Sequence, residues 1–378
     1  MQIGNYNQKR KSINYGPVGF VTNNDFYIEI VADGDNIKNA ELNFNYKYKN
    51  LEKLIENNNL LYNLKLIQNI WKPLSFCYEL ALLSGAEKII GLPISIKDEL
   101  IRIFFSESER IISHLIGLAE VIKLTGISIF FVQSMRFRNN FLKKRELIFK
   151  KQNFYQLLIL GGVKKDIEID DLYNIYSFLI NIKSLIFEME KIMSNIAFKN
   201  RTINIGTISK KLAEAFSLSG PNARASGINY DIRKINFNSA YNMISFEIPL
   251  SDAGDVYSRC YIRIEEIKQS LDILLQCINL LKSSEFNIYE NQYLIEDNGK
   301  INKGQYSIRQ IYNSVESPRG EFGMFLVTEE TDRLYRCKIN GASTNAAQAL
   351  EQIFSSSSFS DIGIIIKSLD IHINEISR

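Results

Sequence analysis

The sequence contains few of the residues that build metal and redox centres. Its 378 residues include two histidines, one tryptophan and four cysteines. The cysteines, at positions 77, 260, 277 and 337, lie far apart and form no Cys-x-x-Cys pair. A metal ion or iron–sulfur cluster held by this chain alone is therefore not expected, and the four cysteines are predicted to be buried, reduced thiols.

A long apolar run and a strong net charge are also lacking. The longest apolar stretch begins near Leu124 and stops at Arg136, which makes it too short to span a bilayer. The basic residues Lys9, Arg10 and Lys11 are followed by polar residues and not by the apolar core of a cleavable signal. A net charge of +3 gives no indication of binding to nucleic acid or to an anionic membrane surface. We expect a chain that is soluble, or peripheral within a membrane-bound assembly.

Apolar periodicity, in contrast, is abundant. A hydrophobic fraction of 46% over 378 residues is enough for a sizeable core. We predict a fold that is mainly α with small β elements. Its parts are an N-terminal β-hairpin region over 1–48, a central helical bundle over 49–290 and a C-terminal α+β portion over 291–378, integrated into one domain.

Local patterns predict the individual elements. Ile28 and Ile30 belong to an alternating strand that ends in a turn at 33–35. Apolar spacing of three and four residues predicts helices over 49–66, 74–90, 97–124, 141–158, 169–196, 255–281, 345–354 and 361–369. The asparagine run at 57–59 weakens the first of these helices. Strand patterns cover 243–250, 322–328 and 334–339, of which the last two are expected to pair in antiparallel fashion.

Two helix starts are predicted from capping patterns. Ser106 and Glu109 have the spacing of a capping box, and a helical face of apolar residues follows them. Asp252 can cap the helix over 255–281, with Asp255 in its first turn.

The stretch 220–281 combines a polar, turn-rich loop with a long amphipathic helix and carries an ordered set of motifs. In chain order these are Ser219-Gly220-Pro221, Ala223-Arg224, Ser226-Gly227, Tyr230-Asp231-Ile232-Arg233-Lys234, Gly254-Asp255, Tyr257, Arg259, Arg263, Glu265-Glu266 and Gln269-Ser270. Further groups outside it are Phe105-Ser106-Glu107, Arg110-Ile111, His114-Leu115, Gly161-Gly162-Val163, Pro318-Arg319-Gly320-Glu321-Phe322-Gly323 and Tyr335-Arg336-Cys337-Lys338-Ile339. This series resembles the large, hydrogenase-like subunit of respiratory NADH:quinone oxidoreductase (complex I), the D-type or 49-kDa subunit family.

The resemblance implies a fold, partners and a location. The fold would be similar to the large subunit of [NiFe]-hydrogenases, although the paired cysteines of a [NiFe] site are absent from the sequence. The implied partners are the terminal iron–sulfur subunit (B-type), the 30-kDa subunit (C-type) and the membrane subunit (H-type). Quinone would be the substrate, and the [4Fe–4S] cluster would belong to the neighbouring subunit. The implied location is the matrix side of the mitochondrial inner membrane, or the cytoplasmic side of a bacterial membrane.

The residues that hold the quinone headgroup in this family are replaced in this sequence. Two histidines of an N-terminal loop fall on Gly19 and Asn23, and the quinone-binding tyrosine falls on Lys72. An aspartate that partners the histidine falls on Leu124. Because a lysine ammonium has three donors and can shift its pKa when buried, Lys72 is the plausible replacement proton donor; the alternative is a solvated lysine.

The family positions near the iron–sulfur cluster are also changed. An arginine falls on Lys49 and a histidine on Phe154, whereas His114 is retained. His114 is either a site residue or a histidine satisfied within the core. Lys49 is either near the cluster or a solvated charge at the start of a helix.

The charged residues of 220–281 form a further set. Because buried charges need partners, and because the loop over 220–234 has the composition to dock onto the following helix, we interpret them as a structural and interface network, with a proton relay as the alternative. The set consists of Arg224, Asp231, Arg233, Arg259, Arg263, Glu265 and Glu266.

Two functions follow from these observations. The first is an enzyme subunit that contributes to quinone reduction and to proton translocation. The second is a structural subunit, or a diverged paralogue, that has kept the scaffold and lost the quinone chemistry.

Overall fold

The computed structural model describes twelve segments of the chain, and all structural statements below concern them. The segments are residues 3–6, 10–15, 27–43, 49–56, 58–71, 74–148, 157–163, 167–236, 239–283, 310–328, 333–355 and 357–376.

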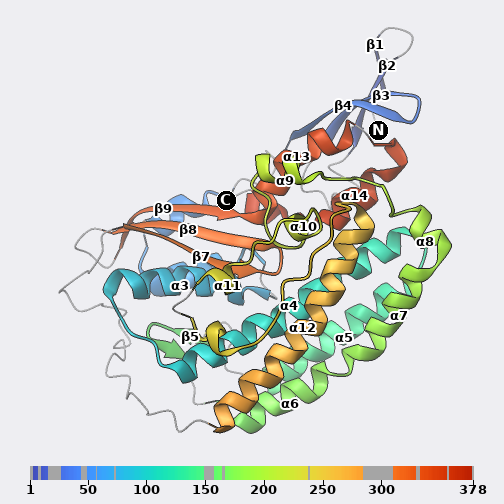
Figure 1. The fold of residues 1–378 in the computed structure, drawn as a ribbon. Helices are drawn as coiled ribbons and strands as arrows, with labels where there is room; N and C mark the ends of the chain where they lie inside the picture. Colours follow the sequence, from blue (N-terminus) through green and yellow to red (C-terminus); the bar gives the residue numbers. More distant parts are fainter. Residues whose placement is uncertain are drawn as a thin grey trace.

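A four-stranded antiparallel sheet with the order β1-β2-β3-β4 begins the chain. Its strands are β1 (Ile3–Tyr6), β2 (Arg10–Tyr15), β3 (Tyr27–Asp33) and β4 (Asn36–Asn43). The turn predicted at 33–35 is confirmed, since Asp33 pairs with Asn36 across a tight loop in which Gly34 has a φ of 64°. Ile28, Ile30 and Ile37 are buried, and β4 packs on α13 (Ala342–Phe354), so this sheet is fixed to an element from the far end of the chain (Figure 1).

Two long helices form the centre of the molecule. Helix α4 (Ile96–Leu124) packs along α12 (Val256–Ser283), and α5 (Ser128–Ile148) and α6 (Ile169–Leu179) pack beside them (Figure 1). The remaining elements up to α12 are α1 (Leu51–Glu56), α2 (Leu60–Ile67), α3 (Phe76–Ile90), β5 (Leu158–Ile159), β6 (Gly162–Val163), α7 (Ile182–Ser194), α8 (Ile196–Asn200), α9 (Lys210–Ala215), α10 (Gly220–Arg224), α11 (Ile232–Ile235) and η4 (Ala240–Met243).

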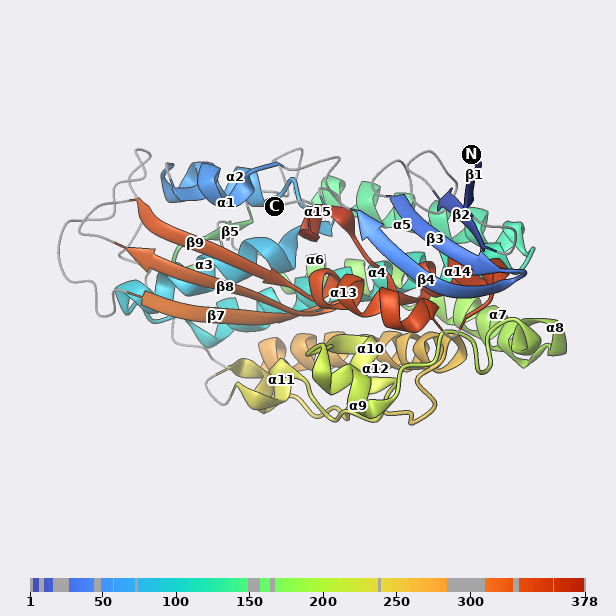
Figure 2. The same ribbon diagram turned by 90° about the horizontal axis from the view of Figure 1, so that it is seen from above.

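A second antiparallel sheet, with the order β7-β8-β9, covers α3. Its strands are β7 (Gln310–Ser317), β8 (Gly320–Thr328) and β9 (Leu334–Gly341). The predicted pairing of 322–328 with 334–339 is confirmed. After this sheet come α13, η5 (Phe359–Asp361), α14 (Ile362–Leu369) and α15 (Ile373–Ile376), and Figure 2 shows α13 beside β4 in the view from above.

Helix α1 protects the free edge of the second sheet. The Glu52 carboxylate accepts a hydrogen bond from the backbone N–H of Ile339 at 3.0 Å, and Glu56 accepts one from Cys337 at 3.2 Å. These two N–H groups lie on β9, the edge strand, which would otherwise present unpaired donors to another chain. Two carboxylates one helical turn apart thus take the place of a neighbouring strand.

The predicted fold class is confirmed, with corrections to several boundaries. The helix predicted over 49–66 is two helices, because Asn59 caps α2 by accepting from the N–H of Tyr62 at 2.9 Å. The helix predicted over 169–196 is interrupted between α6 and α7. The one predicted over 141–158 was wrong at both ends, since α5 begins at Ser128 and Leu158 lies in a strand.

The predicted strand over 243–250 does not form. Part of this segment is extended, but its backbone pairs with a side chain instead of a strand. The Gln276 amide on α12 accepts from the N–H of Ser245 and donates to its carbonyl, both at 2.8 Å. A local apolar pattern does not reveal such a substitute partner.

Both predicted caps were wrong. Ser106 and Glu109 lie in the middle of α4, whose N-cap is Ser95. Helix α12 is capped by Asp255 and not by Asp252, because the Asp255 carboxylate accepts from the N–H of Ser258 at 2.8 Å.

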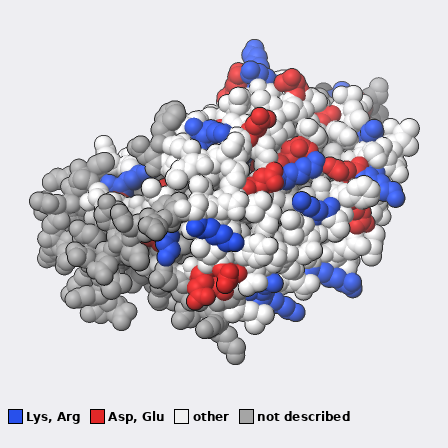
Figure 3. Space-filling view, turned by 60° about the horizontal axis from the view of Figure 1, so that its bottom comes forward, with Lys and Arg blue, Asp and Glu red and all other residues white. Residues whose placement is uncertain are grey.

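The structure also bears on the cysteines, on the possibility of a membrane-spanning helix and on the distribution of surface charge. All four cysteines are buried, as predicted, and none of them is in a disulfide. None of the described helices is long and apolar enough to cross a membrane. On the face drawn in Figure 3, basic and acidic side chains are interspersed among wide uncharged areas.

A close backbone crossing provides a test of the fold. Gly320, with a φ of 129°, begins β8, and a Cβ there would lie 2.7 Å from the Ser219 carbonyl carbon and 2.8 Å from the Gly220 nitrogen. We predict that Gly320→Ala destabilises the chain by about 3 kcal/mol, because strain and a backbone clash add. Thermal melting of the purified assembly would measure the loss.

The control for this substitution is Gly34→Ala. Gly34 also has a positive φ, but a Cβ there meets no atom within 4 Å. Gly34→Ala should therefore lower the free energy of unfolding only by the conformational penalty of about 1–2 kcal/mol. Equal losses for the two variants would contradict the close crossing.

Candidate functional site

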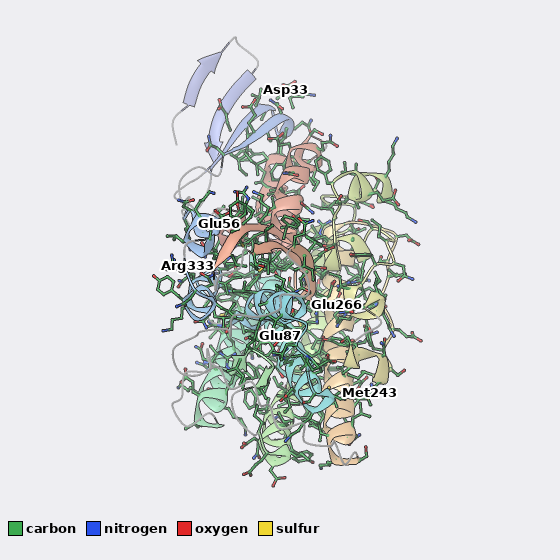
Figure 4. The ribbon with its side chains drawn as sticks, turned by 90° about the vertical axis from the view of Figure 1, so that its left-hand side faces the viewer. Asp33, Glu56, Glu87, Met243, Glu266 and Arg333 are labelled. Atoms are coloured by element: carbon green, nitrogen blue, oxygen red, sulfur yellow. The ribbon has the colours of Figure 1, made fainter. Side chains whose placement is uncertain are left out.

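The face of α4 that meets α12 carries a series of charged side chains. Glu107, Arg110 and His114 follow one another at steps of three and four residues, so they share one side of the helix. The His114 Nε2 atom lies 2.8 Å from Glu266 Oε2 on α12, and Arg110 Nε donates to Glu107 Oε2 at 3.1 Å. All four side chains are fully buried, and Figure 4 shows Glu266 deep inside the molecule.

Arg224, at the end of α10, inserts into the same interior. Its Nε donates to Glu266 Oε1 at 2.8 Å, and its Nη1 donates to Asp231 Oδ2 at 3.1 Å and to Glu316 Oε1 at 3.0 Å. One guanidinium thereby joins α12, the start of α11 and β7. A planar fork with five donors suits such a junction better than a lysine would.

Arg233 closes the network. Its Nη2 donates to Asp231 Oδ2 at 2.6 Å, and its Nη1 donates to Glu107 Oε1 at 3.0 Å. The Arg110 guanidinium lies 3.7 Å from Glu266 on the opposite side. The result is a closed cycle of alternating charges that we call the charge ring: Glu107, Arg110, Glu266, Arg224, Asp231 and Arg233.

Electrostatics keep the acids of the charge ring ionised. Burial acts to raise the pKa of Glu107, but Arg110 and Arg233 overcome it and hold that pKa at about 2. The pKa of Asp231 is likewise lowered to about 2 by Arg233 and Arg224 against the effect of burial. Arg224 and His114 hold the pKa of Glu266 well below its ordinary value. The charge ring is therefore fully ionised and electrically neutral at neutral pH.

Glu316 and His114 each bond to a member of the charge ring, but neither carries a fixed charge at neutral pH. Burial and the neighbouring Asp231 raise the pKa of Glu316 to about 7. Burial lowers the pKa of His114 despite its bond to Glu266, and among the described residues no partner pairs with its Nδ1. Glu316 can therefore exchange a proton near neutral pH, whereas His114 stays neutral.

A cavity of about 350 Å³ reaches one side of the charge ring. It lies between α3, α4, α11 and β7, and its walls include Arg233, Glu316, Lys88, Glu99 and Tyr241. The Tyr241 hydroxyl donates to Glu107 at 2.7 Å and links this wall to the charge ring. Glu316 therefore lies at the boundary between this cavity and the charge ring.

A second buried cluster gathers around Arg319, in the β7–β8 turn. Its Nη1 donates to Tyr78 Oη at 3.2 Å, and the tyrosine donates to Glu375 Oε1 at 2.5 Å. The guanidinium lies over the Trp71 ring, 4.0 Å from its centroid, and its Nε lies 3.4 Å from Asp370 Oδ2. The start of α3 is therefore joined to the last residues of the chain.

The structure separates the predicted charge network into three parts. Arg224, Asp231, Arg233 and Glu266 lie together in the charge ring. Glu265 does not, because it is turned about 100° around α12 from Glu266 and pairs with Lys268 at 2.7 Å near the surface.

Arg259 and Arg263 lie on α12 outside the charge ring. Arg259 is fully buried and donates to the carbonyls of Gly254 and Gly206, at 2.7 and 3.0 Å, and to Ser368 Oγ. Burial and Arg263 lower its pKa to about 9. Arg263 donates to the Arg259 carbonyl at 3.2 Å. Arg259 therefore fixes the start of α12 to α14 and to the loops at Gly206 and Gly254, whereas the Arg263 bond lies within α12.

Of the other predicted site residues, two are described besides His114. Lys49 is exposed, and its Nζ lies 3.4 Å from the Asn69 carbonyl, which brings it next to the segment that ends at Trp71. Leu124 is half-buried against the core at the end of α4. The other four positions lie outside the described residues: Gly19, Asn23, Lys72 and Phe154.

Sequence reasoning missed several residues of both clusters. Glu107, Arg110 and Arg319 were noticed only as members of sequence motifs. The three-and-four spacing of Glu107, Arg110 and His114 on a strongly apolar helix was the available signal, because charges on a buried face need partners. No local pattern indicates that Glu375 reaches Tyr78.

Comparisons with known proteins identify the class. A family model described as "Respiratory-chain NADH dehydrogenase, 49 Kd subunit" matches residues 125–378, so the chain belongs to this family. It is 28% identical to the "NADH-ubiquinone oxidoreductase 49 kDa subunit" of Reclinomonas americana, over 98% of each chain. It is also 28% identical to the D subunit of the NADH-quinone oxidoreductase of Orientia tsutsugamushi (strain Ikeda), again over 98% of each chain. A relative from a differently named enzyme, the D subunit of the F(420)H(2) dehydrogenase of Methanosarcina mazei, is 26% identical over 97% of each chain.

Adjacent glutamates on α12 allow a matched test of the charge ring. Glu266→Gln removes one of the acids that Arg224 and Arg110 contact and leaves the charge ring with one unbalanced positive charge. We therefore expect a loss of about 3 kcal/mol or more in the free energy of unfolding. Glu265→Gln removes only a partly exposed pair and should cost at most about 1 kcal/mol. Thermal melting of the assembly carrying each variant would measure both, and similar values would contradict the proposed importance of the charge ring.

A buried carboxyl on α3 gives a pH-dependent prediction. Glu79 accepts from Ser75 Oγ at 2.6 Å and from Gln68 Nε2 at 3.1 Å, and burial raises its pKa to about 8 from an ordinary 4.5. Between these two pH values the folded chain holds a proton that the unfolded chain has released. Its contribution to stability therefore falls as pH rises, by up to about 1.4 kcal/mol per pH unit.

Glu79→Gln removes this titration while keeping the shape of the side chain. We predict that the melting temperature of the variant improves relative to the original chain as pH rises from 5 to 8. A difference that does not change with pH over this range would contradict the raised pKa.

Proposed function

We propose that this chain is a peripheral-arm subunit of NADH:quinone oxidoreductase and contributes to the quinone-reduction site beside a [4Fe–4S] cluster held by the neighbouring B-type subunit. The observation that carries the proposal is the family match, together with relatives named as subunits of this oxidoreductase over nearly the whole chain. The C-type 30-kDa subunit and the membrane H-type subunit are the other proposed partners. The proposed location is the matrix side of the mitochondrial inner membrane, with the cytoplasmic side of a bacterial membrane as the counterpart.

The geometry around Trp71 supports a site in this region. Trp71 ends a described segment, and its ring is held under Arg319. Lys49, which the resemblance associates with the cluster, contacts the same segment at Asn69. A quinone that accepts two electrons develops negative charge on its oxygens and takes up two protons, so cationic and hydrogen-donating groups suit it. We propose that Lys72, the next residue of the chain, supplies one of these donors.

The second candidate function is a scaffold that has lost the quinone chemistry. It is favoured by the residues at the family's headgroup positions, since glycine, asparagine and leucine occupy positions 19, 23 and 124 and none supplies an acid of the usual kind. On this view the charge ring preserves the fold while proton translocation and quinone reduction are absent.

Comparing Lys72→Ala with the original chain in the native purified assembly distinguishes the two functions. We expect NADH:quinone reductase activity to fall at least tenfold, because a proton donor contributes about 10²–10⁴-fold to such a step. Lys65→Ala, an exposed lysine on α2, is the matched control and should leave the activity unchanged. The amount of this chain in the assembly must be matched for all variants.

The remaining outcomes separate the hypotheses. If the assembly that carries the original chain is intact but has no quinone reductase activity, the scaffold function is favoured. An active Lys72→Ala variant would show that other residues bind the headgroup.

A further inference from the structure

His372, the second of the two histidines, lies at a junction between distant parts of the chain. Asp370 ends α14 with a φ of 53°, and the following residues turn toward α2 and α3. The backbone N–H of His372 donates to Ser343 Oγ at 3.0 Å, and Asn374 Nδ2 donates to the carbonyl of Ile70 at 2.8 Å. The segment is therefore fixed on both sides of the histidine.

The imidazole faces Trp71. The two ring centroids are 5.4 Å apart, with an angle of 45° between the ring planes. The Nδ1 atom of His372 is shielded from solvent, yet among the described residues no donor or acceptor pairs with it. An unpaired buried polar group costs stability that a bound partner would recover, so this nitrogen points to a ligand or an ordered water.

Cationic side chains lie around the imidazole. Burial lowers the pKa of His372 well below its ordinary value, and Arg319, Lys49 and Lys367 add to this effect. Arg319 lies over the other ring of the pair, and Lys367 is itself paired with Glu120 at 3.3 Å. The acids nearby, Asp370 and Glu375, are engaged by Arg319 and Tyr78. A neutral imidazole retains one N–H donor in this cationic setting.

We propose that His372 donates a hydrogen bond to a carbonyl oxygen of the quinone headgroup, next to Trp71. This inference rests on the function proposed above and adds a headgroup-binding residue to it. A quinone carbonyl accepts hydrogen bonds and gains negative charge on reduction, and His372 offers a neutral N–H donor on the same tryptophan ring that Arg319 covers. The imidazole comes from the C-terminal segment, far in sequence from the N-terminal loop in which the family carries its histidines.

Two substitutions separate the hydrogen bond from the packing of the ring. His372→Phe keeps an aromatic ring against Trp71 and removes the donor, whereas His372→Asn keeps a donor on a smaller side chain. Both are compared in the native purified assembly, with a short-chain ubiquinone as the substrate. NADH oxidation with hexacyanoferrate as the acceptor, which bypasses quinone, reports on the integrity of the assembly.

We expect His372→Phe to lower kcat/KM for the quinone about tenfold, mainly through KM, as one lost hydrogen bond would. His372→Asn should recover part of that loss, and hexacyanoferrate reduction should not change. Ile371→Val, in the same segment, controls for repacking and should behave like the original chain.

Specific results would overturn the inference. A kcat/KM for His372→Phe equal to that of the original chain would exclude the hydrogen bond while leaving the proposed function intact. Equal losses for the Phe and Asn variants would assign His372 to packing alone. An original chain that reduces hexacyanoferrate but no quinone would refute the proposed function, and the inference with it.

Discussion

The structure depends on the burial of six charges in one closed, neutral ring. Burying a single carboxylate or guanidinium is costly, and pairs repay the cost only when geometry is good and every hydrogen bond is used. Here each guanidinium contacts two acids, and the acids come from α4, α12 and the start of α11. The long helices therefore have one register in which the ring closes. Apolar packing along α4 and α12 tolerates sliding by a turn far better than this arrangement does.

The same constraint explains why the loop before α11 is ordered. Arg224 and Arg233 reach inward from short elements that have little core of their own, and Glu316 joins them from β7. The sheet, the loop and the bundle are thus held by electrostatic contacts at one point and by apolar contacts elsewhere. Glu316 lies outside the charge ring, so a proton taken up by Glu316 near neutral pH changes the charge beside Arg224 without breaking a salt bridge inside the ring.

The sequence predicted the helices and strands better than the residues at which they begin and end. It also predicted which residues belong to the site better than which side chains they contact. The long helices and the β8–β9 pair were predictable because each repeats one pattern over many residues. The caps at Ser95 and Asp255 were missed because several residues with capping side chains lie close together there. Four of the six residues of the charge ring were predicted, because loop 220–234 and α12 are neighbours in sequence. Glu107 and Arg110 were missed, because they join the ring from a helix about 110 residues earlier in the chain. His372 had no local signal, because its surroundings come from four separate segments.

The Tyr78–Glu375 hydrogen bond also has a consequence for biosynthesis. It joins residues 297 positions apart, so α3 leaves the ribosome long before its acceptor has been made. The Tyr78 hydroxyl therefore has no carboxylate acceptor until Glu375 has been made. A nascent chain in which residues 372–375 have not yet been made would leave Tyr78, Ile70 and Trp71 without these contacts.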